Sequence, residues 1–315
     1  MDVAVYQKGA VPLFRKVRSS KAFGPFLLVP LVAALAGCDV SLGNLSARAT
    51  DEWTHTYPLT AGGEVRIVNT NGRIDIEGID GATLEVRAER IAKGATDAAA
   101  RELLPRIVIK ENVTPDRVTL ETERMSGIML GAGFEVRYHV RAPKNTLVNV
   151  TNTNGQVSVA GIGGKVVAHT TNGGVKGTAL TGGVDARSTN GGVSIEMASV
   201  GPDRISLETT NGGVTLMLPE NAKATVSASC TNGGISVGSL DNFEVSEKSR
   251  RHLEGRLNGG GTEVELQTTN GGIRLRSRDT VNTRTDSDAK AEREDPNELK
   301  KEPKELKELK APKDR

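Results

Sequence analysis

The sequence has few of the residues that stabilise compact globular proteins. It contains only two cysteines, Cys38 and Cys230, and one tryptophan, three tyrosines and five phenylalanines among 315 residues. A core with so few aromatic side chains must consist of Val, Ile, Leu and Ala, which suits thin stacked layers better than a bulky globule. Packing and backbone hydrogen bonds, rather than disulfides, must therefore stabilise the fold.

An excess of charge of one sign is also absent. The chain has 41 basic and 39 acidic residues, but five of the basic residues and one of the acidic residues precede Cys38. Without that leader, 36 basic and 38 acidic side chains remain, and the net charge is −2. Since no positive field remains to attract nucleic acid, we predict no nucleic-acid partner.

The apolar stretch at residues 22–36 is too short to span a bilayer, which takes about 20 apolar residues. It follows a basic segment, so residues 1–37 read as a secretory signal peptide. The stretch ends in Leu35-Ala36-Gly37-Cys38, which resembles the lipobox of bacterial lipoproteins and implies diacylglycerol on the thiol of Cys38. An uncleaved signal anchor, or a plain secretory signal with an incidental cysteine, is the alternative.

The sequence has no recognisable pattern of metal ligands or catalytic residues. The four histidines, His55, His139, His169 and His252, are scattered without ligand spacing. Glycine-rich calcium rolls place aspartate in each corner, whereas Val or Ile follows Gly-Gly in this chain. We predict no metal, no cofactor and no enzymatic activity, although outward acidic residues on successive turns could converge on a site. Those residues are Asp185, Glu196 and Glu208.

What the sequence does contain is a repeat of Thr-Asn-Gly, which predicts the fold. Successive asparagines are 18, 18, 21, 21 and 38 residues apart. A fixed period of this size indicates a β-solenoid, in which each turn is buried only by its neighbours and parallel strands stack about 4.8 Å apart. Antiparallel hairpins closed by Asn-Gly turns are the competing interpretation. The six asparagines are Asn154, Asn172, Asn190, Asn211, Asn232 and Asn270.

Alternation along the strands places each asparagine in the same row as inward residues such as Ala168 and Thr170. We therefore predict that the six amides stack from turn to turn in a structural hydrogen-bonded ladder. The glycines that follow would permit the positive backbone angles of a sharp corner. Cys230 falls in the inward row and is interpreted as a small core residue. The functional alternative is a row of exposed amides that binds a repetitive ligand such as a glycan.

The rest of the chain divides around this repeat. Residues 38–59 are predicted to be the lipid attachment and tether, residues 60–278 the solenoid, and residues 279–315 a disordered charged tail. Residues 95–104 predict one short helix inside the solenoid, and the glycine-rich residues 126–133 predict a loop or a buried connection. Three leucines of the tail could instead line a partner-binding helix; they are Leu299, Leu306 and Leu309.

The early Asn69-Thr70-Asn71-Gly72 copy, the short helix and the serial Thr-Asn-Gly-Gly corners resemble the bacterial putative-adhesin family of β-strand-repeat proteins, a domain of unknown function. The resemblance covers about residues 60–278 and implies an all-β, single-stranded, right-handed parallel β-helix. It also implies a lipid-anchored protein of the cell envelope. Adhesion or scaffolding toward an envelope protein or glycan is the expected role. Envelope-stress sensing is the alternative, and a polysaccharide-acting enzyme is less favoured; the oligomeric state stays open.

Overall fold

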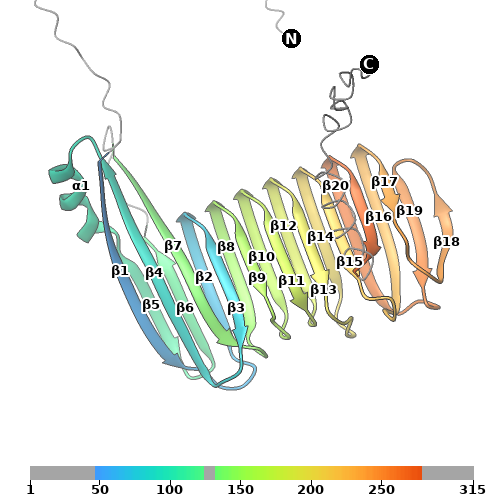
Figure 1. Ribbon diagram of the computed structural model, residues 1–315, viewed down its shortest axis with the longest axis horizontal. Coiled ribbons are helices and arrows are strands. Elements are labelled where there is room, and N and C mark those ends of the chain that lie inside the picture. Colours follow the sequence, from blue (N-terminus) through green and yellow to red (C-terminus); the bar gives the residue numbers. More distant parts are fainter. Residues whose placement is uncertain (1–46, 124–131, 279–315) are drawn as a thin grey trace, which may run out of the picture. The chain divides into compact units, whose positions relative to one another are not determined.

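The computed structural model describes residues 47–123 and 132–278, which fold into two large β-sheets and one short helix (Figure 1). Sheet A has ten strands, in the spatial order β1-β4-β7-β3-β9-β11-β13-β15-β21-β17. Their bounds are Ala47–Pro58 (β1), Thr83–Gly94 (β4), Gly133–Pro143 (β7), Ile74–Ile79 (β3), Val157–Ala160 (β9), Val175–Leu180 (β11), Val193–Met197 (β13), Val214–Leu218 (β15), Ile273–Ser277 (β21) and Ile235–Val237 (β17). The predicted all-β class is therefore confirmed.

Sheet B has eleven strands, in the spatial order β18-β19-β16-β20-β14-β12-β10-β8-β2-β6-β5. Their bounds are Phe243–Lys248 (β18), His252–Leu257 (β19), Ala224–Asn232 (β16), Thr262–Asn270 (β20), Ile205–Asn211 (β14), Val184–Asn190 (β12), Val166–Asn172 (β10), Leu147–Asn154 (β8), Glu64–Asn71 (β2), Arg117–Thr122 (β6) and Ile109–Thr114 (β5).

The core lies between the two sheets and consists of one layer of aliphatic side chains from each. In β12, for example, Val184 and Ala186 are buried, whereas Asp185 and Arg187 face outward. The same alternation runs through β10, β14 and β20, and the inward residues of both sheets form one continuous cluster. Period-two patterning with small aliphatic residues therefore fixes which face of each strand is buried.

The central strands of both sheets are parallel and in register. Val166 of β10 pairs with Val184 of β12, which pairs with Ile205 of β14. Asn172, at the end of β10, is aligned in the same way with Asn190 of β12. Each glycine corner takes the chain from a strand of sheet B to the next strand of sheet A, rather than back along the same sheet. The hairpin interpretation is thus wrong for the central repeats (Figure 1).

Both ends of the sheets depart from a single parallel coil. β1 pairs with β4, and β4 with β7, in antiparallel fashion, as do β5 with β6, β16 with β19, and β19 with β18. The two sheets are therefore mixed. The prediction of one parallel β-helix through the whole domain holds only for its centre. Of these antiparallel pairs, β5 with β6 and β18 with β19 are hairpins, whereas the others join strands that are not consecutive in the sequence.

The spatial order of the coils also differs from the order in the sequence. β2 and β3 lie between the coil of β6 and β7 and the coil of β8 and β9. β20 and β21 lie between the coil of β14 and β15 and the coil of β16 and β17. The interval of 38 residues before Asn270 is about twice the usual one, because the β18–β19 hairpin lies in the sequence between the coil of β16 and β17 and the coil of β20 and β21.

The predicted helix is confirmed, whereas the predicted tether is too long. α1 spans Asp97–Leu103, η1 spans Leu104–Arg106, and the hydroxyl of Thr96 caps the helix by accepting the Ala99 N–H at 3.2 Å. Residues 47–58, assigned to the tether, instead form β1, paired along its whole length with β4. The folded domain therefore includes residues well before position 60.

Several predictions concern residues outside the described ranges. These are the signal peptide, Cys38, the apolar loop around residues 128–130 and the tail from residue 279. Among the residues that the structure describes, no helix has the length and apolar character needed to cross a membrane.

Candidate binding surface at the repeat corners

The asparagines of the Thr-Asn-Gly repeats form a continuous amide ladder along one corner of the domain. Each Nδ2 donates to the Oδ1 of the asparagine on the neighbouring coil, at 2.7–2.9 Å. In spatial order the ladder runs through Asn71, Asn154, Asn172, Asn190, Asn211, Asn270 and Asn232. Parallel pairing in register produces it, since identical side chains then stack directly on each other.

The position of the ladder differs from the predicted one. Asn172, Asn190, Asn211, Asn232 and Asn270 are exposed, and only Asn71 and Asn154 are partly buried. The strand alternation fails here because each asparagine stands at the end of its strand, where the chain turns away from the core. The two predicted roles are therefore not exclusive, since the amides bond to each other and also face solvent.

A second polar column, which the sequence analysis missed, lies two residues before each asparagine and is buried. Thr170 Oγ1 donates to the carbonyl oxygen of Gly155 at 3.2 Å, and Ser188 Oγ donates to that of Gly173 at 2.7 Å. Thr209 and Thr268 make the equivalent bond on their coils. The signal was available, because alternation points these residues inward, where a polar group must find a partner.

The inner column changes character at its two ends. Asn69 and Asn152 occupy it near β6, and each Nδ2 donates to two backbone carbonyls. Their Oδ1 atoms have no hydrogen-bond partner among the described residues. At the other end Cys230 takes the same position in β16 and is buried, as predicted for a small core residue.

The first position of each corner is glycine mainly because the backbone of the neighbouring coil lies too close for a side chain, and less because of a positive φ. A Cβ added at Gly191 would overlap the carbonyl oxygen of Gly173, and one added at Gly212 would overlap that of Gly191. Among the first glycines of the described corners, only Gly72, Gly155 and Gly173 have positive φ, of 126°, 134° and 157°. The predicted reason for glycine is thus correct at three corners, and steric exclusion acts at all of them.

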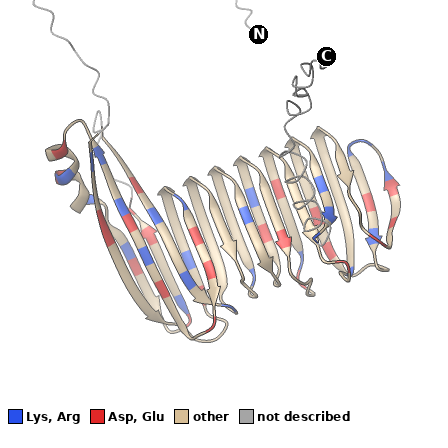
Figure 2. Cartoon of the chain, in the orientation of Figure 1, with Lys and Arg blue, Asp and Glu red and all other residues tan. Residues whose placement is uncertain are grey.

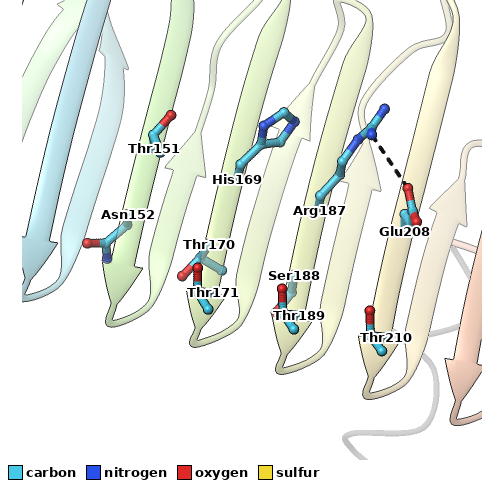
Figure 3. Close-up of a pocket in the computed structure, with 10 residues that line it drawn as sticks. All are labelled: Thr151, Asn152, His169, Thr170, Thr171, Arg187, Ser188, Thr189, Glu208 and Thr210. Atoms are coloured by element: carbon cyan, nitrogen blue, oxygen red, sulfur yellow. Dashed lines mark ion pairs between the residues drawn. The ribbon is translucent and has the colours of Figure 1, made fainter.

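Exposed threonines accompany the ladder on the outer face of sheet B. The residue before each asparagine is always threonine, and Thr171, Thr189, Thr210, Thr231 and Thr269 are exposed. The threonine column and the amide ladder form a polar strip, which we call the Thr-Asn strip. Thr171, Thr189 and Thr210 also line one side of a shallow groove (Figure 3).

The other side of that groove is a row of charged side chains on successive strands. His169 Nε2 lies 3.3 Å from Asp185 Oδ1, and Arg187 Nε lies 2.9 Å from the same oxygen. Arg187 Nη1 lies 3.6 Å from Glu208 Oε2 (Figure 3). Partial burial pushes the pKa of Asp185 up, but hydrogen bonds from Arg187 and His169 outweigh it and hold that pKa below its usual value. Of the three predicted outward carboxylates, the structure brings Asp185 and Glu208 to the same arginine, whereas Glu196 lies on sheet A.

Two further groups of titratable side chains lie near the ends of the sheets. In β1, Trp53 stacks on His55 at 4.2 Å between ring centroids, while Tyr57 Oη donates to Glu111 of β5 at 2.6 Å and His55 Nδ1 lies 3.0 Å from that carboxylate. Burial and Glu111 raise the pKa of Tyr57. These contacts connect the edge strand of sheet A to the edge strand of sheet B.

The second group is Glu247, His252 and Glu254, on the β18–β19 hairpin. His252 Nε2 lies 3.4 Å from Glu254 and 3.9 Å from Glu247, and both glutamates are exposed. The spacing of these residues in the sequence did not predict that they meet, because their contact depends on how β18 pairs with β19. That pairing includes a bulge between Val245 and Glu247. Lys and Arg are interspersed with Asp and Glu along the strands (Figure 2).

Solved structures with a similar chain carry descriptions related to adhesion. A putative cell adhesion protein from Clostridium sporogenes is 14% identical, with a TM-score of 0.43, and the alignment covers 73% of this chain and 100% of that one. A putative adhesin from Bacteroides fragilis is 10% identical, with a TM-score of 0.27 and coverage of 72% and 97%. One from Parabacteroides distasonis is 11% identical, with a TM-score of 0.24 and coverage of 71% and 97%.

No curated protein matches the chain. The model of the Toastrack family, DUF4097, matches residues 114–276, which is just over half of the 315 residues and contains all six predicted ladder asparagines. The resemblance to an adhesin-like domain of unknown function is thereby confirmed. The chain belongs to the Toastrack family.

Proposed function

We propose that this Toastrack protein is a non-enzymatic lipoprotein of the bacterial cell envelope, and that its domain presents an adhesion or scaffold surface. The observation that carries the proposal is the exposed Thr-Asn strip. A side-chain amide has two N–H donors and an oxygen with two lone pairs, and the ladder uses one donor and one lone pair of each inner member. The remaining groups are available to a ligand.

The regular spacing of the strip favours a repetitive ligand. Parallel strands lie about 4.8 Å apart, so equivalent hydroxyl and amide groups recur at that interval along the corner. A polymer with recurring polar groups, such as an envelope glycan, can contact several equivalent positions, and weak contacts then add up. A second protein with an extended edge is the other partner consistent with this surface.

The charged row beside the strip supports a binding role rather than catalysis. Asp185 is held by His169 and Arg187, and Arg187 also pairs with Glu208, as on a solvated sheet surface. The coils themselves are proposed to be right-handed, because connections between parallel strands of one sheet almost always have that hand.

Anchoring through lipid on Cys38 is the second part of the proposal. Two or three acyl chains would hold the protein on the membrane, since each buried methylene contributes about 0.8 kcal/mol. Cells grown with a radiolabelled fatty acid should incorporate label into the wild-type protein and not into Cys38→Ser. The matched control is Cys230→Ser, which should stay labelled. Label on the Cys38→Ser protein would contradict lipidation at this residue.

The binding role is tested by crosslinking the full chain in its native membrane and identifying the captured partners. The variant combines Thr171→Val, Thr189→Val and Thr210→Val, which remove three hydroxyls of the strip while keeping side-chain shape. We expect it to lose the captured envelope partner, whereas Thr56→Val on β1 should keep it. An unchanged partner set would refute the strip as the binding surface. Capture of a membrane-bound stress regulator would instead favour the sensing role.

A further inference from the structure

A second groove lies on the other side of the glycine corner, on the outer face of sheet A. Its lining includes Lys176 of β11, Ser194 of β13, Thr215 of β15 and Arg274 of β21. These four residues are neighbours in register, so they form one row that crosses four adjacent strands. We call this row and the adjoining second glycines of the corners the sheet A groove.

The groove carries positive charge without acidic partners. Lys176 and Arg274 are exposed, and neither takes part in any ion pair within the described residues. No carboxylate is among the residues that line the groove. Several arginines nearer the β1 end of sheet A differ in this respect, since Arg73, Arg87, Arg137 and Arg141 each pair with an acidic side chain. Two unpaired cations with hydroxyl groups between them suit a ligand with negative charges and polar oxygens.

Over most of its length the floor of the groove consists of glycines without side chains, although the fold could accommodate a side chain there. The second residue after the ladder asparagine is Gly174, Gly192 or Gly213 over most of the groove. It is Gln156 at one end of the groove and Arg73 in the next coil beyond that end. None of these three glycines has positive φ. A Cβ added at Gly192 or Gly213 would lie 3.3 Å from the next carbonyl oxygen, so a shift of a few tenths of an ångström would accommodate it.

The backbone of the floor also offers hydrogen-bond donors. Within residues 47–123 and 132–278, the N–H groups of Gly174, Gly192 and Gly213 have no hydrogen-bond acceptor. The N–H groups on either side, such as those of Gly191 and Val193, donate to the neighbouring coil. A ligand that lies on the floor can therefore approach the backbone closely, beside N–H groups that donate to no described residue.

We infer that the sheet A groove binds a linear acidic polysaccharide that runs across the strands. Lys176 and Arg274 are three strand spacings apart, or about 14 Å along the groove. Ser194 and Thr215 stand between them and supply hydroxyl groups to the sugar oxygens. An extended polymer with recurring carboxylates fits this row better than a compact ligand. The inference rests on the proposed function, because it names the ligand class of the same envelope-facing domain.

The test measures binding of the full lipidated chain, in detergent, to polygalacturonate and to neutral dextran by biolayer interferometry. We expect the wild type to bind polygalacturonate more tightly than dextran, and an increase from 50 to 500 mM salt to weaken that binding about tenfold, because exposed charges are screened. Lys176→Gln with Arg274→Gln should weaken it by about tenfold or more. The matched control, Arg66→Gln with Lys165→Gln, removes the same charge elsewhere on the domain and should bind as the wild type does.

A second variant tests the floor without any change of charge. Gly192→Gln inserts the side chain that the fold already accommodates at Gln156, so it should fold, as checked by its melting temperature, and still lose polygalacturonate binding. The inference is overturned if polygalacturonate does not bind, or if binding persists in both groove variants. The crosslinked partner set judges the proposed function separately, because the threonine variant changes the strip and leaves the sheet A groove intact.

Discussion

At the scale of single residues, the first glycine of each corner is the position least able to change. Gly191 packs on the carbonyl oxygen of Gly173, and Gly212 packs on that of Gly191. The contact recurs at every coil because the chain must turn between two sheets whose strands are only about 4.8 Å apart. Space for a side chain exists at the second glycine and not at the first.

Gly191→Ala should therefore lower the free energy of unfolding by about 2 kcal/mol, because the added methyl group forces the two coils apart. The loss exceeds the gain of about 0.4–1 kcal/mol that Gly→Ala brings by restricting the unfolded chain. Urea unfolding followed by circular dichroism measures it. Gly234→Ala, where no atom lies within 4 Å of the added Cβ, is the control and should be neutral or slightly stabilising. Equal stability of the two variants would contradict the steric argument.

The buried polar column, by contrast, predicts a substitution that raises the free energy of unfolding. Thr170, Ser188, Thr209 and Thr268 each donate a hydroxyl to a glycine carbonyl of the neighbouring coil, whereas Cys230 has only a weakly donating thiol in the same place. Cys230→Ser should raise the free energy of unfolding by about 1 kcal/mol, because a buried carbonyl gains a stronger donor. Thermal unfolding should rank Cys230→Ser above wild type and above Cys230→Ala. A serine variant less stable than the alanine variant would refute the role of this column.

At the scale of elements, the strands of sheet B are connected on their outer face by charge as well as by the ladder. Asp185 of β12 accepts hydrogen bonds from His169 of β10 and from Arg187 of its own strand. The central strands need such outward pairing because only one of their faces is buried. Arg187 also has an opposite charge, Glu208, directly across from it on β14.

This row predicts how stability depends on acid. The pKa of Asp185 is lower in the folded chain than its ordinary 3.8, so the folded state favours the ionised carboxylate. Its stabilisation is fully present above that ordinary value, and it is lost as the pH falls through the lower folded pKa. The free energy of unfolding, measured by urea titration between pH 6 and about pH 2, should therefore fall less steeply below about pH 4 in Asp185→Asn than in wild type. Asp203→Asn, which removes a carboxylate that makes no ion pair within the described residues, should leave the wild-type slope. Identical slopes for wild type and Asp185→Asn would contradict the assignment.

At the scale of the whole domain, the order of the coils links distant parts of the chain. A simple solenoid frays from its ends, since each repeat depends only on its neighbours in sequence. Here β20 and β21 are covered on both sides, by the coil of β14 and β15 and by the coil of β16 and β17. The last described coil in the sequence is therefore an interior coil in space.

Hydrogen exchange should reflect this order in space. The backbone N–H groups of β20 and β21 should exchange about as slowly as those of β12 and β14, because both sets are interior. The N–H groups of β18, at the edge of sheet B, should exchange fastest. Mass spectrometry of peptides from deuterated protein measures these rates. Protection that falls steadily toward residue 278 would show that the coils stack in sequence order instead.

The sequence by itself determined the elements with a regular period. The alternation of small aliphatic residues predicted the strands and their buried faces, the spacing of Thr-Asn-Gly predicted parallel stacking in register, and the residues around Thr96 predicted the helix. Each of these features depends on local geometry or on identical repeats, and both can be recognised in a single sequence. The amide ladder followed from the same register.

Tertiary structure alone decided the features that depend on which coil is next to which. β1 was assigned to a tether because only its antiparallel partner β4 makes it part of a sheet. The interior position of β20 depends on a long-range choice that the repeat cannot encode, since all corners carry the same motif. Contacts between coils depend on which coils are neighbours in space rather than on spacing along the chain. For this reason the structure alone decided the exposure of the asparagines, the partners of the inner hydroxyls and the row from Lys176 to Arg274.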